Sequence, residues 1–308
     1  MYVFAGLFVL YEKKSARGLF VLLFYGYLQR NKYSKKIDIM LQNLPLLRHA
    51  GSGHFFLIAG PCVIENETMP MEIARHISGI CDRLSVPYIF KASYRKANRS
   101  SLHSFTGIGD VRGLELLAEV RETLHIPVLT DVHSPEEARR AADYVDVLQI
   151  PAFLCRQTDL LVAAAESGKW VNIKKGQFVS PEAMKFAVEK VRAVGNPHVM
   201  LTERGTSFGY HDLIVDFTGI AAMQRNQCPV ILDVTHALQQ PNQSTGVTAG
   251  KRDLIEVLAK AGVAAGFDGL FMETHPNPDA ALSDASTMLP LANLEPLLEK
   301  LIRLQEAL

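Results

Sequence analysis

Several features that would assign a chain to a familiar class are missing from this sequence. None of its apolar runs reaches the roughly 18 residues that a membrane-spanning helix needs. Its 32 basic and 32 acidic side chains leave no net positive charge, whereas a general nucleic-acid-binding protein normally carries a basic excess. With 21% charged and 48% hydrophobic residues, the composition also excludes a disordered or collagen-like chain. We therefore expect a globular protein with a sizeable core that does not bind nucleic acid.

Cysteine is scarce and scattered. Cys62, Cys81, Cys155 and Cys228 form no CxxC pair, and so few thiols in a chain of this length do not make a disulfide framework. We expect a reduced, cytoplasmic protein whose thiols are core residues, with at most one acting as a ligand.

Charge is distributed unevenly along the chain. Residues 1–39 hold seven Lys or Arg and two Asp or Glu, so the remainder carries a net charge of −5. The same segment contains two short apolar runs, 2–11 and 19–28, with no small-residue cleavage site after them. A membrane-surface anchor is one interpretation, but an appendage or sequence upstream of a true start at Met40 fits better. We predict that residues 1–50 are an extension outside the fold and expect no firm membrane association.

From residue 55 onward, short apolar or β-branched runs alternate with stretches of helical periodicity. The expected strands are 55–59, 88–91, 127–132, 145–150, 171–174, 198–202, 230–234 and 269–273. The expected helices are 69–84, 113–124, 135–142, 158–167, 181–194, 212–225, 252–264 and 294–308. Eight such pairs in about 250 residues predict a (β/α)8 TIM barrel over 51–308, as a single domain. A doubly wound sheet is the alternative, but Gly60-Pro61-Cys62 lacks its glycine-rich turn.

Polar side chains gather at the carboxyl ends of the expected strands, where barrel enzymes place their chemistry. They are Lys91, Asp131, His133, Gln149, Asn172, Lys174, Glu203, Arg204, His236 and Glu273. In the segment 170–175 the alternation of side chains directs Lys174 into the barrel and Lys175 outward. A buried ammonium group needs a counter-charge, so Lys174 meets either an anionic ligand or a partner such as Asp131 or Glu203.

Four of the residues could form a metal site. In a closed barrel the eighth strand pairs with the first, so Cys62, His236, Glu273 and Asp284 converge on one arc. This mixed S/N/O set suits Fe²⁺, Zn²⁺, Mn²⁺ or Co²⁺. A cysteine near a strand end is, however, often a core residue, and a glutamate is often solvated, so the residues alone leave this question open.

A second group is basic and lies at or just beyond the strand ends: Lys91, Lys96, Arg99, Arg156, Lys174 and Arg204. Together with nearby Ser100, it indicates a substrate, or two, with several phosphate or carboxylate groups. Asp131 and His133 are candidates for proton transfer, although a histidine beside a carboxylate is also a common structural pair. Glu65 either caps the following helix or binds in the site.

Seven motifs lie at or just after the ends of the expected strands: 59–65 (AGPCVIE), 90–101 (FKASYRKANRSS), 149–159 (QIPAFLCRQTD), 172–178 (NIKKGQF), 203–210 (ERGTSFGY), 233–236 (DVTH) and 271–276 (FMETHP). Together they resemble the motifs of the 3-deoxy-D-manno-octulosonate 8-phosphate synthase family. The resemblance covers residues 55–308. It implies condensation of phosphoenolpyruvate with arabinose 5-phosphate, with release of phosphate, in lipopolysaccharide biosynthesis.

The resemblance also implies roles for individual residues. Cys62 marks the metal-dependent branch, because the metal-independent branch carries asparagine there, and the implied ligands are Cys62, His236, Glu273 and Asp284. The residues implied for phosphoenolpyruvate are Lys91, Lys96, Gln149, Lys174 and Arg204, and those for arabinose 5-phosphate are Asn98, Arg99 and Ser100, with Ala152 also at the substrate. A homotetramer is implied, with Arg156 reaching a neighbouring site.

Two departures from the family pattern stand out: residues 1–50 have no counterpart, and loop 239–250 lacks the usual glycine-rich stretch. The nearest alternative is the sister enzyme that uses erythrose 4-phosphate, 3-deoxy-D-arabino-heptulosonate 7-phosphate synthase, but it would carry Lys-Pro-Arg-Thr-Ser near residues 96–101. A non-catalytic sugar-phosphate-binding barrel would have lost some of the site residues, and all are present. A metal-dependent aldolase without phosphoenolpyruvate leaves the second set of anion-binding residues unexplained.

Overall fold

The structure is a computed structural model that describes residues 39–99, 102–241, 243 and 248–308. The two apolar runs of the N-terminal extension and Ser100 lie outside the described residues, as does part of loop 239–250.

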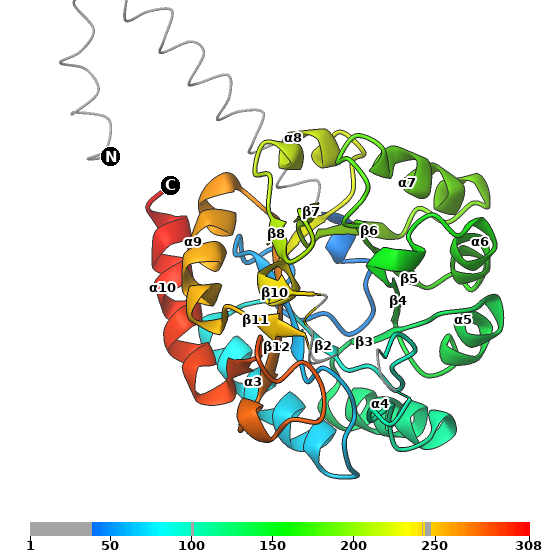
Figure 1. Ribbon diagram of the computed structural model, residues 1–308, viewed down its shortest axis with the longest axis horizontal. Helices are drawn as coiled ribbons and strands as arrows, with labels where there is room; N and C mark the ends of the chain where they lie inside the picture. Colours follow the sequence, from blue (N-terminus) through cyan, green and yellow to red (C-terminus); the bar gives the residue numbers. More distant parts are fainter. Residues whose placement is uncertain (1–38, 100–101, 242, 244–247) are drawn as a thin grey trace, which may run out of the picture.

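The centre of the molecule is a closed barrel of eight parallel strands (Figure 1). They are β1 (Phe56–Gly60), β2 (Tyr88–Lys91), β3 (Val128–Asp131), β4 (Val147–Ile150), β5 (Trp170–Lys174), β6 (Val199–Glu203), β9 (Val230–Asp233) and β12 (Gly269–His275). Each strand pairs with its neighbour in chain order, and β12 pairs with β1 from Phe56↔Gly269 to Gly60↔Glu273. The predicted (β/α)8 barrel is therefore confirmed, with every predicted strand within two residues of its observed ends.

Helices surround the barrel (Figure 1). They are α3 (Met69–Leu84), α4 (Asp110–Leu124), α5 (Pro135–Ala141), α6 (Thr158–Glu166), α7 (Met184–Ala193), α8 (Gly219–Gln224), α9 (Ile255–Ala265) and α10 (Leu294–Glu306). Helix α3 shows why these segments are helical: Pro70 sits in its first turn, and Ile73, Ile77 and Ile80 form a buried stripe at helical spacing. It ends at Ser85, which adopts a left-handed conformation with φ of 54°.

One predicted helix, 212–225, is wrong over its first half. Residues Asp212–Ile214 form strand β8, which pairs antiparallel with β7 (Thr206–Phe208), and only α8 is helical. Gly209 makes the turn with φ of 63°, a conformation that glycine adopts without strain. These residues form a hairpin rather than a helix because β7 lies beside them and is available for pairing. Helical periodicity in the sequence does not report such a tertiary contact.

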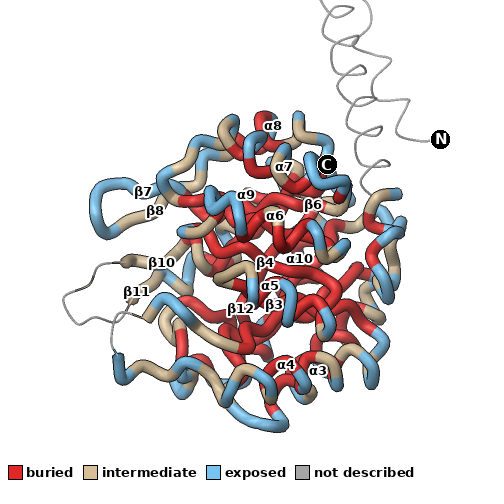
Figure 2. Tube along the Cα trace, turned by 90° about the vertical axis from the view of Figure 1, so that its right-hand side faces the viewer, coloured by how far each residue is buried: buried red, intermediate tan, exposed pale blue. Residues whose placement is uncertain are grey.

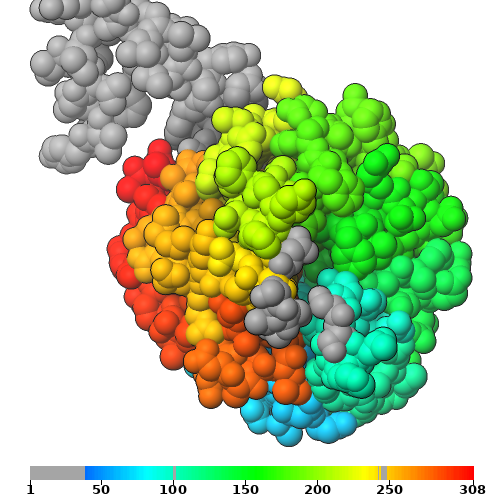
Figure 3. All heavy atoms as spheres, in the orientation of Figure 1, coloured from blue at the N-terminus to red at the C-terminus, as the bar shows by residue number. Residues whose placement is uncertain are grey.

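Two hairpins lie above the carboxyl ends of the barrel strands: β7–β8, and the short pair β10 (Gln239–Gln240) and β11 (Ala249–Gly250). The side view of Figure 2 places both at the same end of the molecule, and Figure 3 shows that face with all its side chains.

The core has two layers. Outward-facing strand residues pack against the helices, whereas inward-facing residues such as Phe56, Trp170 and Phe271 fill the barrel. Leu41 and Leu44 join this inner cluster and are 3% and 2% exposed, although the sequence pattern assigns them to the extension. The division of the chain at residue 50 stays a prediction, and this packing favours placing it before residue 40.

Among the described residues, no helix combines the length and the apolar character that crossing a membrane requires.

Candidate active site

A cavity of about 470 Å³ opens at the carboxyl ends of the barrel strands. Its lining includes most of the residues singled out from the sequence: Lys91, Lys96, Asn98, Arg99, Asp131, His133, Gln149, Ala152, Lys174, Arg204, His236, Glu273 and Asp284. They come from seven strands or the loops that follow them, and barrel closure brings them together. The individual roles of these residues stay predictions.

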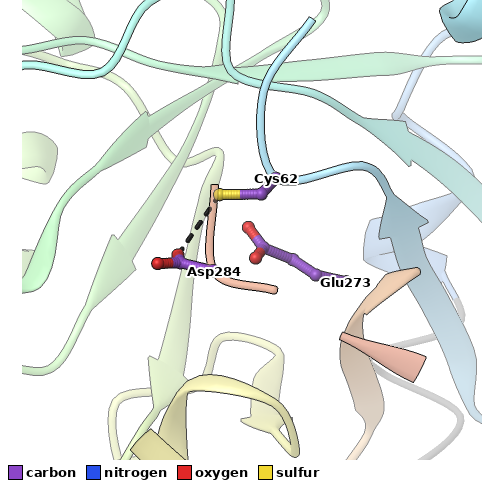
Figure 4. A group of neighbouring side chains, drawn as sticks. All are labelled: Cys62, Glu273 and Asp284. Carbon is purple, nitrogen blue, oxygen red and sulfur yellow. Dashed lines mark hydrogen bonds between the residues drawn. The ribbon is translucent and has the colours of Figure 1, made fainter. Parts of the chain in front are cut away.

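Cys62, Glu273 and Asp284 point toward one another from three different segments (Figure 4). Each offers one ligand atom, and these atoms lie within 4.8 Å of one another. The Cys62 thiol donates a hydrogen bond to Asp284 Oδ2 at 3.2 Å, and its Sγ also lies 2.8 Å from Ser283 Oγ. A thiol and two carboxylates, 222 residues apart in sequence at the extremes, therefore face a common point.

His236, the fourth predicted ligand, lies beside this group of three and is not part of it. Its Nε2 lies 3.5 Å from Glu273 Oε1 and 3.7 Å from Asp284 Oδ2. A tetrahedral ion with bonds of roughly 2.0–2.3 Å separates its ligand atoms by about 3.2–3.8 Å, so these two distances suit such an ion. Glu273 Oε2 is buried and has no hydrogen-bond partner among the described residues. The chemistry of Cys62, Glu273 and Asp284 fits a divalent metal, and His236 as the fourth ligand stays a prediction.

The charges around Cys62, Glu273 and Asp284 would favour a bound cation. Burial raises the pKa of the Cys62 thiol, and the negative charges of Asp284 and Glu273 raise it further. Burial also opposes the ionisation of Glu273, but His236 and Lys91 outweigh it and lower the pKa of Glu273 to about 2. Lys96 and Lys91 oppose the rise at Cys62 without outweighing it, and a bound divalent cation would stabilise the thiolate further.

Lys91 forms hydrogen bonds to two of these candidate ligand residues. Its Nζ donates to Glu273 Oε1 at 2.6 Å and to the Cys62 carbonyl oxygen at 2.9 Å, and the side chain is 1% exposed. Lys91 therefore orients two of the candidate ligands, in addition to lining the cavity.

Asp233, at the end of β9, is a site residue that the sequence argument missed. Its Oδ2 accepts hydrogen bonds from Lys174 Nζ and, at 2.7 Å, from His236 Nδ1. Its Oδ1 accepts from the backbone N–H groups of Thr235 and His236. The sequence does contain a signal for Asp233, because it ends a strand and faces inward by the same alternation that singled out Lys174.

The inward direction of Lys174 is confirmed, but its partner differs from both predicted carboxylates. Lys174 pairs with Asp233, and its Nζ lies 3.2 Å from the centre of the Phe271 ring. Lys175 points outward as predicted, where it is fully buried with its Nζ 3.4 Å from Glu203 Oε1. Glu203 in turn accepts from the N–H of Arg204 at 2.9 Å, which fixes the start of the loop that carries this arginine.

A row of polar side chains crosses the barrel beneath the cavity. Asp131 accepts from Gln149 Nε2 at 2.6 Å, Gln149 Oε1 accepts from Asn172 at 2.9 Å, and Asn172 accepts from Thr202 at 2.7 Å. Burial would raise the pKa of Asp131, but the neighbouring charges of Lys91 and Lys96 outweigh it and lower that pKa. These hydrogen bonds pair the buried polar groups of the four side chains, and the row forms the base of the cavity.

Two guanidinium groups in the cavity wall have free nitrogens. Arg99 donates Nε to the Phe105 carbonyl oxygen at 2.9 Å, and Arg204 donates Nη2 to Gln239 at 2.8 Å. Arg99 Nη2 and Arg204 Nη1 are buried and have no partner among the described residues. Because buried donors are costly when unpaired, these atoms mark places for an anionic ligand.

Arg156, like Cys62, Glu65, Asn172 and Glu203, is a residue that the sequence singles out and that does not line the cavity. It follows the 3-10 helix η1 (Ala152–Leu154) and is exposed.

Glu65 neither caps α3 nor lines the cavity. Its Oε1 accepts from the Leu282 N–H at 2.9 Å, and its Oε2 lies 3.7 Å from His275 Nε2. Glu65 follows Cys62 by three residues, while Leu282 precedes Asp284 by two. It therefore joins the segments that carry Cys62, Glu273 and Asp284.

Comparison with known proteins supports this picture. The family model described as the DAHP synthetase I family matches residues 40–308. A protein of Koribacter versatilis named 2-dehydro-3-deoxyphosphooctonate aldolase is 55% identical over 260 residues, which cover 83% of this chain and 93% of that protein. Proteins of the same name from Desulfotalea psychrophila and Nitrosococcus oceani are each 51% identical, over 83% and 80% of this chain and 92% and 88% of their own lengths. The chain belongs to the DAHP synthetase I family and, within it, groups with the 2-dehydro-3-deoxyphosphooctonate aldolases.

Proposed function

We propose that this protein is a transferase that condenses phosphoenolpyruvate with D-arabinose 5-phosphate and water to give 3-deoxy-D-manno-octulosonate 8-phosphate and phosphate. The product matches the name of the relatives, an eight-carbon 2-keto-3-deoxy acid phosphate. The observation that carries the proposal is the cavity itself, where Arg99 and Arg204 each have a buried nitrogen with no partner among the described residues, as the binding of a polyanionic substrate pair requires.

The charges of the substrates explain the cations of the site. Phosphoenolpyruvate brings a phosphate and a carboxylate, and the sugar brings a second phosphate. Lys174 ends β5 and Arg204 directly follows β6, whereas Lys96, Asn98 and Arg99 lie on the loop after β2. Binding both substrates in one cavity replaces their water with fixed cations and brings the two reacting carbons together.

The reaction needs charge stabilisation at two points. Carbon 3 of the enol phosphate attacks the aldehyde carbon, so that positive character develops at carbon 2 and negative charge at the aldehyde oxygen. Water adds at carbon 2, and the resulting hemiketal phosphate collapses with loss of phosphate. Fixed carboxylates such as Asp131 favour the positive centre, and the lysines and arginines favour the departing phosphate. Asp131 and His133 are the groups placed to move protons.

Cys62, His236, Glu273 and Asp284 would hold a divalent metal in this site. The mixed sulfur, nitrogen and oxygen donors suit Fe²⁺, Zn²⁺, Mn²⁺ or Co²⁺. Such an ion would supply a Lewis acid beside the bound substrates. The contribution of the chain is the placement of the ligands, through Lys91 on Glu273 and Asp233 on His236.

We further propose a cytoplasmic homotetramer in which Arg156 reaches the site of a neighbouring copy. Arg156 is exposed and does not line its own cavity. Phe153, Phe178 and Phe208 expose 44%, 62% and 66% of their surface at the same end of the molecule. Exposed aromatic side chains of this kind are typical of protein interfaces. All four cysteines are free thiols, which suits a reducing compartment.

Phosphate release from phosphoenolpyruvate by the purified full-length chain tests the proposal. Arabinose 5-phosphate and erythrose 4-phosphate are compared, each after chelation and after addition of Fe²⁺, Zn²⁺ or Mn²⁺. We expect release with arabinose 5-phosphate alone, lost on chelation and restored by metal. Release with erythrose 4-phosphate would assign the sister activity. No release with either sugar would indicate a non-catalytic binding barrel. Release that persists in chelator would show that the reaction needs no metal.

A further inference from the structure

His133 presents one edge of its ring to the active-site cavity and the other to helix α5. It follows strand β3 by two residues and lines the cavity. Its Nδ1 lies 2.8 Å from Glu137 Oε2, and its backbone N–H donates to the same oxygen at 2.9 Å. Glu137 does not line the cavity, so the Nε2 edge is the one that bound substrate meets.

Glu137 is fixed from the opposite direction as well. It lies in the first turn of α5, where its backbone N–H donates to Ser134 Oγ at 3.2 Å. Its second oxygen, Oε1, lies 3.3 Å from Arg95 Nη1. Arg95 immediately precedes Lys96, on the loop that carries Asn98 and Arg99 into the cavity. One carboxylate therefore connects His133 to the loop that lines the sugar-phosphate side of the cavity.

The charge on Glu137 decides the proton position on His133. Burial would raise the pKa of Glu137, but the hydrogen bond and charge of His133 outweigh it and lower that pKa to about 2. At neutral pH the carboxylate is ionised and can only accept hydrogen bonds. The proton of a neutral His133 ring must then sit on Nδ1, which leaves the Nε2 lone pair toward the cavity.

We propose that Glu137 is a positioning residue for catalysis: it holds His133 in the Nδ1–H tautomer, so that Nε2 exchanges a proton with the bound substrates or water, and it keeps this group in register with the Arg95 loop. The inference rests on the proposed function for the identity of the substrates. Glu137 itself stays ionised throughout, because its role is to orient and to stabilise positive charge on the ring rather than to carry the proton.

Glu137→Gln and Glu137→Ala separate charge from geometry. A glutamine carbonyl accepts the same two N–H groups without the charge, whereas alanine removes both. In Glu137→Gln we expect a smaller loss of kcat than in Glu137→Ala, because the amide oxygen still accepts from the Nδ1–H of His133. In Glu137→Ala we expect kcat to fall about 10- to 100-fold, with KM for phosphoenolpyruvate changed less than about twofold. Glu136→Gln, on the exposed side of the same helical turn, is the matched control and should follow the wild type.

Two readouts keep this inference separate from the proposed function. If the wild type condenses the two substrates but Glu137→Gln and Glu137→Ala keep the wild-type kcat, Glu137 has no positioning role. If the wild type shows no condensation, the proposed function fails, and ¹⁵N-histidine NMR tests the inference directly. The His133 resonance, assigned by its loss in His133→Asn, should show the Nδ1–H tautomer in wild type and a shift toward Nε2–H in Glu137→Ala. An Nε2–H ring in the wild type would overturn the inference.

Discussion

Asp233 holds His236 by a 2.7 Å hydrogen bond from Nδ1–H to Oδ2, so that the opposite nitrogen, Nε2, faces Glu273 and Asp284. The same oxygen also pairs with Lys174. A single carboxylate thus orients one candidate metal ligand and one candidate substrate-binding cation, which couples the two halves of the site.

Replacing Asp233 by asparagine should weaken metal binding and phosphoenolpyruvate binding together. Loss of the carboxylate that orients a ligating histidine typically costs 10- to 100-fold in metal affinity, and Lys174 loses its counter-charge. We expect a metal affinity lower by about that factor, from competition with a chromophoric chelator, and a raised KM for phosphoenolpyruvate. The exposed Asp216→Asn variant is the control. Unchanged metal affinity in Asp233→Asn would show that His236 is not a ligand.

Cys62→Ala should remove most bound metal and nearly all activity, because the thiolate is one of four expected ligands. Cys81→Ala is the matched control, since Cys81 is also a buried free thiol but lies in α3. Metal content after gel filtration, measured by mass spectrometry, reports the difference. Full activity of Cys62→Ala in chelator would refute the ligand assignment. Cys62→Asn should give weak turnover without metal, as the metal-independent branch of the family suggests.

Glu65→Ala should loosen the loop that carries Asp284 without touching a ligand. The variant loses the bond to the Leu282 N–H and the contact with His275, so we expect metal affinity to fall several-fold while circular dichroism stays unchanged. Glu65→Gln keeps an acceptor for Leu282 and should retain most of the affinity. Equal affinities for alanine, glutamine and wild type would show that this link does not position Asp284.

The proposed role of Arg156 predicts complementation between subunits. Arg156→Ala inactivates the active site of the neighbouring subunit, whereas Lys174→Ala inactivates the active site of the same subunit. Each pure variant should therefore be nearly inactive. Oligomers reassembled from a mixture contain some sites with both residues intact, and we expect recovery of roughly a quarter of wild-type activity if each site combines two chains at random. Mixing without subunit exchange is the control. No recovery in verified mixed oligomers would place Arg156 outside the neighbouring site.

The ionised state of Glu137 should contribute to stability in a definite pH range. Its pKa falls from the usual 4.5 to about 2 in the folded chain, so the stabilisation is complete above about pH 5 and is lost as the pH falls toward 2. Between pH 5 and 3, the free energy of unfolding should drop by up to about 2 kcal/mol more in wild type than in Glu137→Gln. Urea unfolding at both pH values measures this, and parallel losses would contradict it.

Much of this protein can be predicted from local pattern. The alternation of strand and helix is a local periodicity, so it predicts the eight barrel strands and most helices from the sequence. The inward direction of Lys174 follows from the two-residue repeat of a strand. The convergence of Cys62, Glu273 and Asp284 follows from one further step, the closure of the barrel.

The partners of these residues are decided only by the tertiary structure. Lys174 reaches Asp233 rather than Asp131 or Glu203 because the tilt and stagger of a closed barrel set which inward side chains meet. Glu65 meets the Leu282 N–H, and Arg95 meets Glu137, across loops whose paths no periodicity describes. The segment 212–225 begins as a strand because a pairing partner lies beside it. The sequence determines which side chains reach this end of the barrel, whereas the three-dimensional paths of the loops determine which of them touch.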